Sequence, residues 1–203
     1  MRSAEDVLLE GIRAGQFGGE SKPHGEHAMG FVAFSSTPHA VFVGDVVDLG
    51  SGAGLPALVL ADAFEDTRWT LIERRQGRTE LLTRAVHRLR LQDRVSVVAE
   101  DAALVGRGPL RGCADWVTAR SFGPPGDTAE CASPFLRTGG SLLVSEPRSG
   151  DLERRWPKAG LERTGLEFEE SWMTPSGKYA RFRRTPQEIP DLPRRGARKT
   201  LLF

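Results

Sequence analysis

Three alternate glycines after an apolar run form the part of the sequence with the clearest chemical potential. The run ends at Asp48 and Leu49, and Gly50, Gly52 and Gly54 follow directly. This order predicts a buried parallel strand, a tight turn and a helix. Glycines let the turn fold tightly and let a ligand lie against bare backbone. Because a helix N-terminus offers free N–H groups and a positive dipole end, we expect a ligand that is anionic or bears a carboxylate.

A second acid follows the next predicted strand, at residues 69–72. It is Glu73, a little over twenty residues after Gly50, which is the spacing of one βα unit. A carboxylate has only acceptor oxygens and can therefore accept hydrogen bonds from both hydroxyls of a ribose. The alternative is a solvated acid that pairs with a neighbouring arginine (Arg74, Arg75 or Arg78).

The spacing of the glycines distinguishes two kinds of nucleotide-binding turn. A dinucleotide fingerprint, G-x-G-x-x-G, would need a third glycine where Leu55 stands, and it does not include an acid such as Asp48 within the strand. The segment instead resembles the first motif of class I S-adenosylmethionine (SAM) methyltransferases, in which an acid within the strand precedes G-x-G-x-G. The resemblance implies SAM as the cofactor.

Strand and helix patterns alternate after residue 43, which predicts an α/β fold with a mostly parallel sheet covered on both faces. We expect helices at residues 55–64, 76–90 and 128–136, and further strands at residues 95–98, 116–119 and 141–145. A terminal antiparallel hairpin is expected from residues 166–172 and 179–183, around a turn at 174–177.

The sequence divides into an N-terminal helical extension, residues 1–43, and one domain, residues 44–203. In the extension we expect helices at 4–14 and 26–34, separated by a glycine-rich loop at 15–25. Neither a signal-peptide segment nor an apolar run of membrane length is present, and the two cysteines give no disulfide framework. A cytoplasmic protein is expected, with no membrane partner.

Charge is unevenly distributed along the 203 residues, although the net charge is only +1. Residues 178–199 hold eight basic and two acidic side chains, a local charge of +6 that leaves −5 on the remainder. A basic end on an acidic body suits contact with a phosphate backbone. A solvated edge strand and a frayed tail would show the same pattern, because edge strands often carry charge against aggregation.

Motifs further along the chain resemble those of the GidB/RsmG family, whose members methylate guanine N7 in small-subunit (16S) ribosomal RNA. The resemblance covers most of the chain, from about Pro23 onward, and is closest to the short actinobacterial members. It rests on the glycine turn through Pro56 and on four later segments, at residues 71–79, 118–125, 144–147 and 193–196. It implies a Rossmann-like class I methyltransferase fold with a seven-stranded sheet, and a monomer that acts on 16S rRNA or the small ribosomal subunit and not on DNA.

The resemblance also assigns roles to single residues. Gly50 and Leu55 would contact SAM within the turn that Asp48, Gly52 and Gly54 complete, and Glu73 would hold the ribose. Ala102 and Ala103 align with the pair that contacts adenine. Arg120 aligns with an arginine of the SAM site; the alternative for it is a salt bridge to an acid such as Glu130 or Glu146. No catalytic base is assigned, because guanine N7 bears a lone pair and no proton.

Two departures from the family pattern concern the methyl acceptor more than SAM. Asp101-Ala102-Ala103 stands where the family commonly has Arg-Ala-Glu, and Glu146-Pro147 stands where the main members have Lys-Gly. An acid near the phosphate backbone of RNA would be unfavourable. Two alternatives therefore remain open: a paralogue that methylates a small molecule, and a module that binds SAM or RNA without transfer.

Two further groups of side chains have a functional and a structural interpretation. Phe122 would lie where the acceptor enters, to stack on a base or to pack under the loop. His24 and His27 are three residues apart, a spacing that would put them on one face of a helix, but no Cys, Asp or Glu cluster completes a metal site, and no metal is expected.

Overall fold

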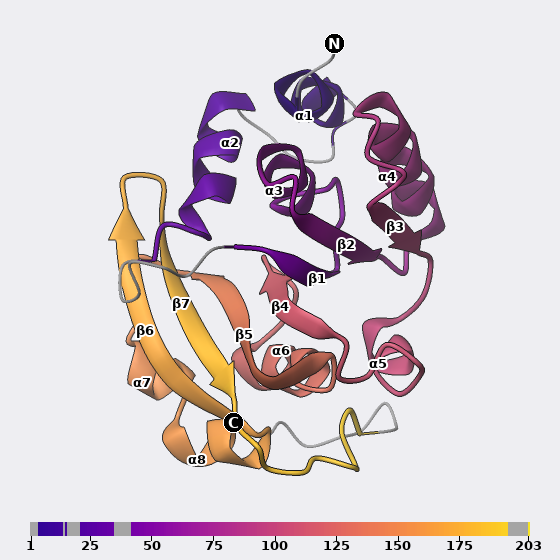
Figure 1. Ribbon diagram of the computed structural model, residues 1–203. Helices are drawn as coiled ribbons and strands as arrows, with labels where there is room; N and C mark the ends of the chain where they lie inside the picture. The colour runs from indigo at the N-terminus through magenta and orange to yellow at the C-terminus, as the bar shows by residue number, and fades with distance from the viewer. Residues whose placement is uncertain (1–3, 14, 16–20, 35–41, 195–202) are drawn as a thin grey trace.

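The structure is a computed structural model that describes residues 4–13, 15, 21–34, 42–194 and 203. A seven-stranded sheet forms its centre, in the order β3-β2-β1-β4-β5-β7-β6 (Figure 1). The first five strands run parallel, and β7 is antiparallel to both β5 and β6. The predicted fold class, mostly parallel with a C-terminal antiparallel hairpin, is confirmed. The strands are β1 Gly44–Leu49, β2 Thr67–Ile72, β3 Val95–Val98, β4 Ala114–Ala119, β5 Leu136–Glu146, β6 Leu166–Thr174 and β7 Gly177–Arg184.

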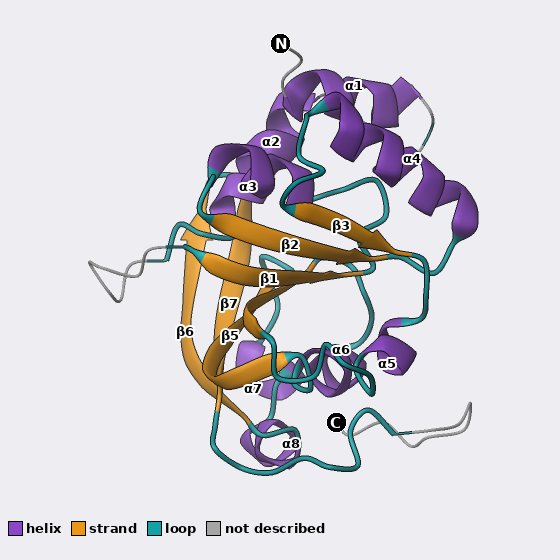
Figure 2. Ribbon diagram, turned by 45° about the vertical axis from the view of Figure 1, so that its right-hand side comes forward, coloured by secondary structure: helices purple, strands orange, loops and turns teal. Residues whose placement is uncertain are grey.

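Helices cover the sheet on two sides (Figures 1 and 2). The upper layer in Figure 1 holds α1 Ala4–Arg13, α2 Ser21–Gly30, α3 Ala57–Ala63 and α4 Gln76–Arg88. The lower layer holds α5 Ala102–Val105, α6 Pro125–Ala132, α7 Leu152–Arg155 and α8 Lys158–Arg163. Within the described residues, each helix is too short or too polar to cross a membrane.

The sheet is buried because its two faces pack against separate apolar clusters. One cluster, on the side of α3 and α4, includes Leu58, Trp69 and Leu82, and the other includes Val117 and Phe135. The last four residues of β1 are all buried, as expected for a central parallel strand. The apolar run that precedes the glycine turn therefore forms the middle of the sheet.

The predicted elements lie close to the observed ones, with these corrections. The expected loop at residues 15–25 is wrong in its last part, because α2 already begins at Ser21, and the expected helix at 26–34 is wrong beyond Gly30, where α2 ends. The expected helix at 128–136 ends earlier, since Leu136 begins β5, and α5, α7 and α8 were not predicted. Ala14 and residues 16–20 lie outside the described residues. The division of the chain at residue 43 stays a prediction.

Among the described residues, most basic side chains of the segment 178–199 form contacts within the protein. Arg181 is buried and pairs with Glu169 at 2.9 Å and Glu170 at 3.6 Å. Arg183 pairs with Glu167, and Arg194 pairs with Glu130. These contacts do not support phosphate binding by this charge, and the alternative of a solvated edge strand is wrong for β7, which lies between β5 and β6. Arg195, Arg198 and Lys199 lie outside the described residues.

The N-terminal helix α2 is fastened to the C-terminal hairpin by side-chain hydrogen bonds. The hydroxyl of Tyr179 donates to the His27 carbonyl at 2.8 Å, and the indole of Trp172 donates to the Gly30 carbonyl at 2.7 Å. Tyr179 is fully buried, and its ring leaves no room for a side chain at position 30, where a Cβ would lie 2.2 Å from the hydroxyl oxygen. Two segments at opposite ends of the chain are thereby held together.

Gly30→Ala should destabilise the protein by about 1–3 kcal/mol, because the added methyl group must displace a buried ring. The matched control is Gly25→Ala on the same helix, where a Cβ would meet no atom within 4 Å. That change should be neutral or stabilising by about 0.5–1 kcal/mol, since alanine favours a helix over glycine. Urea unfolding of the two variants measures the difference; equal stabilities would contradict this packing of α2.

Candidate functional site

A cleft of about 920 Å³ opens at the carboxyl end of the parallel strands. The chain proceeds from β1 to β2 and β3 on one side, and then returns to place β4 on the other side of β1. In open α/β sheets, ligands bind outside this point of reversal. Four of the predicted site residues line the cleft: Gly50, Glu73, Ala102 and Ala103.

The glycine turn connects β1 to α3 in a backbone conformation that requires glycine. Gly50 has φ +63° and Gly54 has φ +95°, both in the left-handed region. A Cβ at position 50 would lie 2.9 Å from the Phe122 ring, and one at position 54 would lie 2.3 Å from Leu58. The turn therefore presents bare backbone to the cleft at Gly50 and packs tightly against α3 at Gly54.

Glu73 is the acid that connects the glycine turn to the loop after β2. One carboxylate oxygen accepts from the Gly52 N–H at 3.0 Å, and the other accepts from the Arg75 N–H at 2.8 Å. The side chain is buried, yet it lines the cleft. No ion pair joins Glu73 to the neighbouring arginines within the described chain, so the alternative interpretation of this acid lacks support. Each oxygen keeps a lone pair for a further donor.

Asp48 lies behind the turn and does not line the cleft. It is 1% exposed, and one of its carboxylate oxygens accepts from the Thr118 hydroxyl at 2.6 Å. Its Oδ2 atom has no hydrogen-bond partner among the described residues. Burial raises the pKa of Asp48 from 3.8 to about 7, although the hydrogen bond from Thr118 opposes the shift. Asp48 supports the turn from within the sheet.

The remaining predicted residues surround the cleft without lining it. Gly52, Gly54 and Leu55 form the inner part of the turn, and Leu55 packs with Ala28 of α2 and Val59. Arg120 follows β4 and is half-buried, which lowers the pKa of its guanidinium, while Asp48 acts in the opposite direction. The acids considered as partners of Arg120 pair with other arginines, Glu130 with Arg194 and Glu146 with Arg155.

The loop after β3 forms the opposite wall of the cleft. Asp101 caps α5 by accepting from the Ala103 N–H at 2.9 Å, and it pairs with Arg74 at 3.8 Å. The backbone donor of Ala103 is therefore already occupied. Five arginines line the cleft together with four acids, and the arginines are Arg74, Arg75, Arg78, Arg107 and Arg194.

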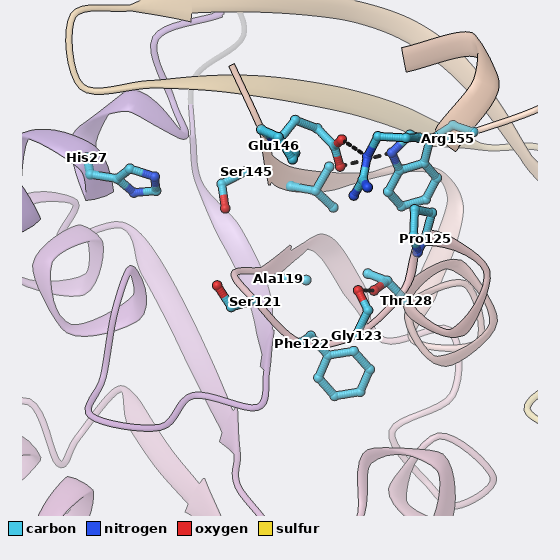
Figure 3. A pocket seen from close by; sticks show the side chains of 13 residues that line it. His27, Ala119, Ser121, Phe122, Gly123, Pro125, Thr128, Ser145, Glu146 and Arg155 are labelled. Atoms are coloured by element: carbon cyan, nitrogen blue, oxygen red, sulfur yellow. Dashed lines mark hydrogen bonds and ion pairs between the residues drawn. The ribbon is translucent and has the colours of Figure 1, made fainter. Parts of the chain in front are cut away.

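A second pocket, of about 320 Å³, adjoins the cleft at the ends of β4 and β5 (Figure 3). Ser121, Phe122 and Gly123 line both spaces, so the loop after β4 forms the boundary between them. The far wall of this pocket includes Glu146 and Arg155, a pair that was not predicted from the sequence. The Phe122 ring lies beside Gly50, where an added Cβ would be 2.9 Å from it. It also packs against the apolar cluster that includes Val117 and Phe135.

His27 reaches the second pocket from α2 (Figure 3). Burial, then Arg120 and His24, lower its pKa to about 4, so the imidazole is neutral at pH 7. Its Nδ1 atom has no hydrogen-bond partner among the described residues. Over the same residues, His, Cys, Asp and Glu side chains form no group of three that could hold a metal ion.

The profile of a known family, GidB, described as rRNA small subunit methyltransferase G, matches residues 30–153. The chain belongs to the GidB family. The predicted resemblance to this family is thus confirmed over residues 30–153, which include the glycine turn, Glu73 and the loop after β4.

Relatives named ribosomal RNA small subunit methyltransferase G show the same relationship. The protein from Sorangium cellulosum is 35% identical over 143 residues, which are 70% of this chain and 59% of that protein. The one from Salinispora arenicola is 35% identical over 166 residues, 78% of this chain and 67% of that protein. The one from Thermobifida fusca is 45% identical over 109 residues, 54% and 44% of the two chains. The chain thus spans about two thirds or less of these relatives' lengths.

Solved structures with the same fold are distant in sequence. A putative S-adenosyl-L-methionine-dependent methyltransferase from Methanococcus maripaludis has a TM-score of 0.63 and 17% identity, covering 89% of this chain and 92% of that one. A geranyl diphosphate methyltransferase has a TM-score of 0.64 and 13% identity, covering 90% and 87%. The fold is that of class I SAM-dependent methyltransferases.

The pKa of Asp48 predicts a pH dependence of stability that Asp48→Asn should remove. The folded protein keeps a proton that the unfolded chain releases above about pH 4. Asp48 therefore contributes a fall in the free energy of unfolding between about pH 4 and 7, whereas His27, whose pKa is lowered from 6.5 to about 4, contributes a rise over part of the same range. Urea unfolding over this pH range should show that the variant gains stability with rising pH relative to the wild type; parallel profiles would contradict the assignment.

Proposed function

We propose that this protein transfers a methyl group from SAM to guanine N7 of 16S rRNA. Family membership supports the reaction class. The observation that carries the proposal is the cleft between the glycine turn, Glu73 and α5, together with the second pocket that shares the loop after β4. This arrangement offers one space for a methyl donor and an adjoining one for an acceptor.

The residues of the cleft fit SAM by their chemistry. Glu73 would accept hydrogen bonds from the ribose hydroxyls, and Gly50 would allow close approach of the backbone. Ala102 and Ala103 would contact the adenine. The other predicted residues would act without lining the cleft. Arg120 would add positive charge beside Asp48, and the conformation of the turn would depend on Asp48, Gly52, Gly54 and Leu55.

The acceptor chemistry asks little of the protein beyond orientation. SAM supplies a methyl carbon that is electrophilic because it is bound to a positively charged sulfur. Guanine N7 bears a lone pair and no proton, so no side chain has to remove one. The protein must hold the base so that N7 lies in line with the methyl carbon, which is catalysis by proximity and orientation. The neutral His27 adds no positive charge against the methylated base.

The proposed setting follows from the substrate. We propose that the protein acts as a monomer in the cytoplasm, on the small ribosomal subunit or on its free RNA. The departures at residues 101–103 and 146 keep a small-molecule acceptor as the competing proposal.

Tritiated SAM tests the proposal when offered with free 16S rRNA, purified small subunits or a metabolite extract. Label should enter RNA, and mapping should find it as N7-methylguanosine. Label in small molecules alone would establish the competing acceptor. SAM binding without transfer to any acceptor would indicate a binding module and contradict the proposed reaction.

Gly50→Ala should weaken SAM binding about tenfold or more. The added methyl group would lie 2.9 Å from the Phe122 ring, at a residue with φ +63°, and would distort the turn that faces the cleft. The control is Gly77→Ala at the start of α4, where a Cβ has no atom within 4 Å and the affinity should not change. Calorimetric titration compares them; wild-type affinity in Gly50→Ala would contradict the proposed position of SAM.

A further inference from the structure

The wall of the second pocket contains a buried carboxylate with two fixed partners. Glu146 ends β5 and its side chain is 3% exposed. One carboxylate oxygen accepts from the Arg155 Nε atom at 2.6 Å, and the other accepts from the Trp156 indole nitrogen at 3.0 Å (Figure 3). Both oxygens of Glu146 are therefore held by the segment at α7.

The same contacts fix the direction of the Arg155 guanidinium. Asp151 caps α7 by accepting from the Arg154 N–H, which fixes the start of the short helix. Arg155 uses Nε for Glu146, and its two terminal nitrogens make no hydrogen bond or ion pair among the described residues. They point away from Glu146 into the pocket (Figure 3), and 37% of the side chain is exposed.

A guanidinium whose two terminal nitrogens are unoccupied is best suited to bind a phosphate group. Its fork of donors matches the oxygens of a phosphate and can bind them in pairs. Contact with the edge of the guanine base is less favourable, because the base becomes positively charged when N7 is methylated. A phosphate carries negative charge and lies outside the base, so it avoids this repulsion.

We propose that Arg155 binds a phosphate of the RNA backbone beside the methylated guanine, and that Glu146 is the residue that positions it. This inference rests on the proposed function, since it takes RNA as the acceptor. It also gives the acid at position 146 a role in RNA binding. Glu146 orients Arg155, nine residues later in the chain, and Arg155 attracts the phosphate.

The salt dependence of RNA binding tests the phosphate contact. Each phosphate contact contributes about 0.7–0.9 to the slope of log affinity against log salt concentration. With radiolabelled 16S rRNA in filter binding, Arg155→Ala should lower the slope by about this amount and leave SAM affinity unchanged. Arg154→Ala removes the same charge from an exposed position on the same helix and should lower it much less. Equal changes in the two variants, or none in Arg155→Ala, would overturn the proposal.

Two further variants separate positioning from charge. Glu146→Gln keeps the Arg155 charge but weakens its orientation, so the slope should stay near the wild type while KM for RNA rises about tenfold. Arg155→Gln keeps a donor for Glu146 without the charge, and it should reproduce the lower slope even if the alanine variant does not fold. Unchanged KM in Glu146→Gln would overturn the positioning role.

The same assays distinguish this inference from the proposed function. If wild-type protein methylates 16S rRNA but Arg155→Ala keeps its slope and KM, only the inference on Arg155 fails. If wild-type protein transfers no label to free rRNA or to small subunits, the proposed function fails and this inference fails with it.

Discussion

The two hydrogen bonds of the Glu73 carboxylate hold together the loops that form the floor of the cleft. One joins the glycine turn after β1, at Gly52, and the other joins the loop after β2, at Arg75. These loops follow adjacent parallel strands, and the carboxylate is buried between them. A buried carboxylate is costly unless its oxygens are satisfied, so both loops are constrained in position. The bare backbone at Gly50 faces the cleft because this constraint, the tight packing at Gly54 and the Phe122 ring fix the turn.

The second pocket depends on contacts between parts of the chain that are far apart in sequence. Tyr179 and Trp172 of the hairpin fasten α2, and this places His27 opposite the end of β5. The loop after β5 brings Arg155 to Glu146 on the other side. The second pocket is therefore assembled from contacts between segments that are far apart in sequence, whereas the cleft is formed by the segments that directly follow β1, β2, β3 and β4. Of the two departures from the family pattern, Glu146-Pro147 lies at the second pocket, whereas Asp101-Ala102-Ala103 lines the cleft.

Sequence reasoning predicts best where chemistry and local structure coincide. The strand at residues 95–98 and the start of α4 at Gln76 were predicted correctly, because apolar periodicity and the following polar residues mark them. Gly50 and Glu73, predicted as cofactor contacts from the glycine turn and from the acid after the next strand, both line the cleft. The Arg155–Glu146 pair could not be predicted, since α7 has four residues and no periodicity links it to β5. The basic end was ambiguous because charge alone does not reveal that Arg181, Arg183 and Arg194 each have an acid as a partner.

The central claim is that the cleft between the glycine turn, Glu73 and α5 is a SAM site and not a site for another nucleotide. Calorimetric titration of the wild-type protein with S-adenosylhomocysteine and, separately, with NAD⁺ tests it most directly. We predict binding of S-adenosylhomocysteine at one site per chain and no measurable binding of NAD⁺. Binding of NAD⁺ without binding of S-adenosylhomocysteine would contradict the account.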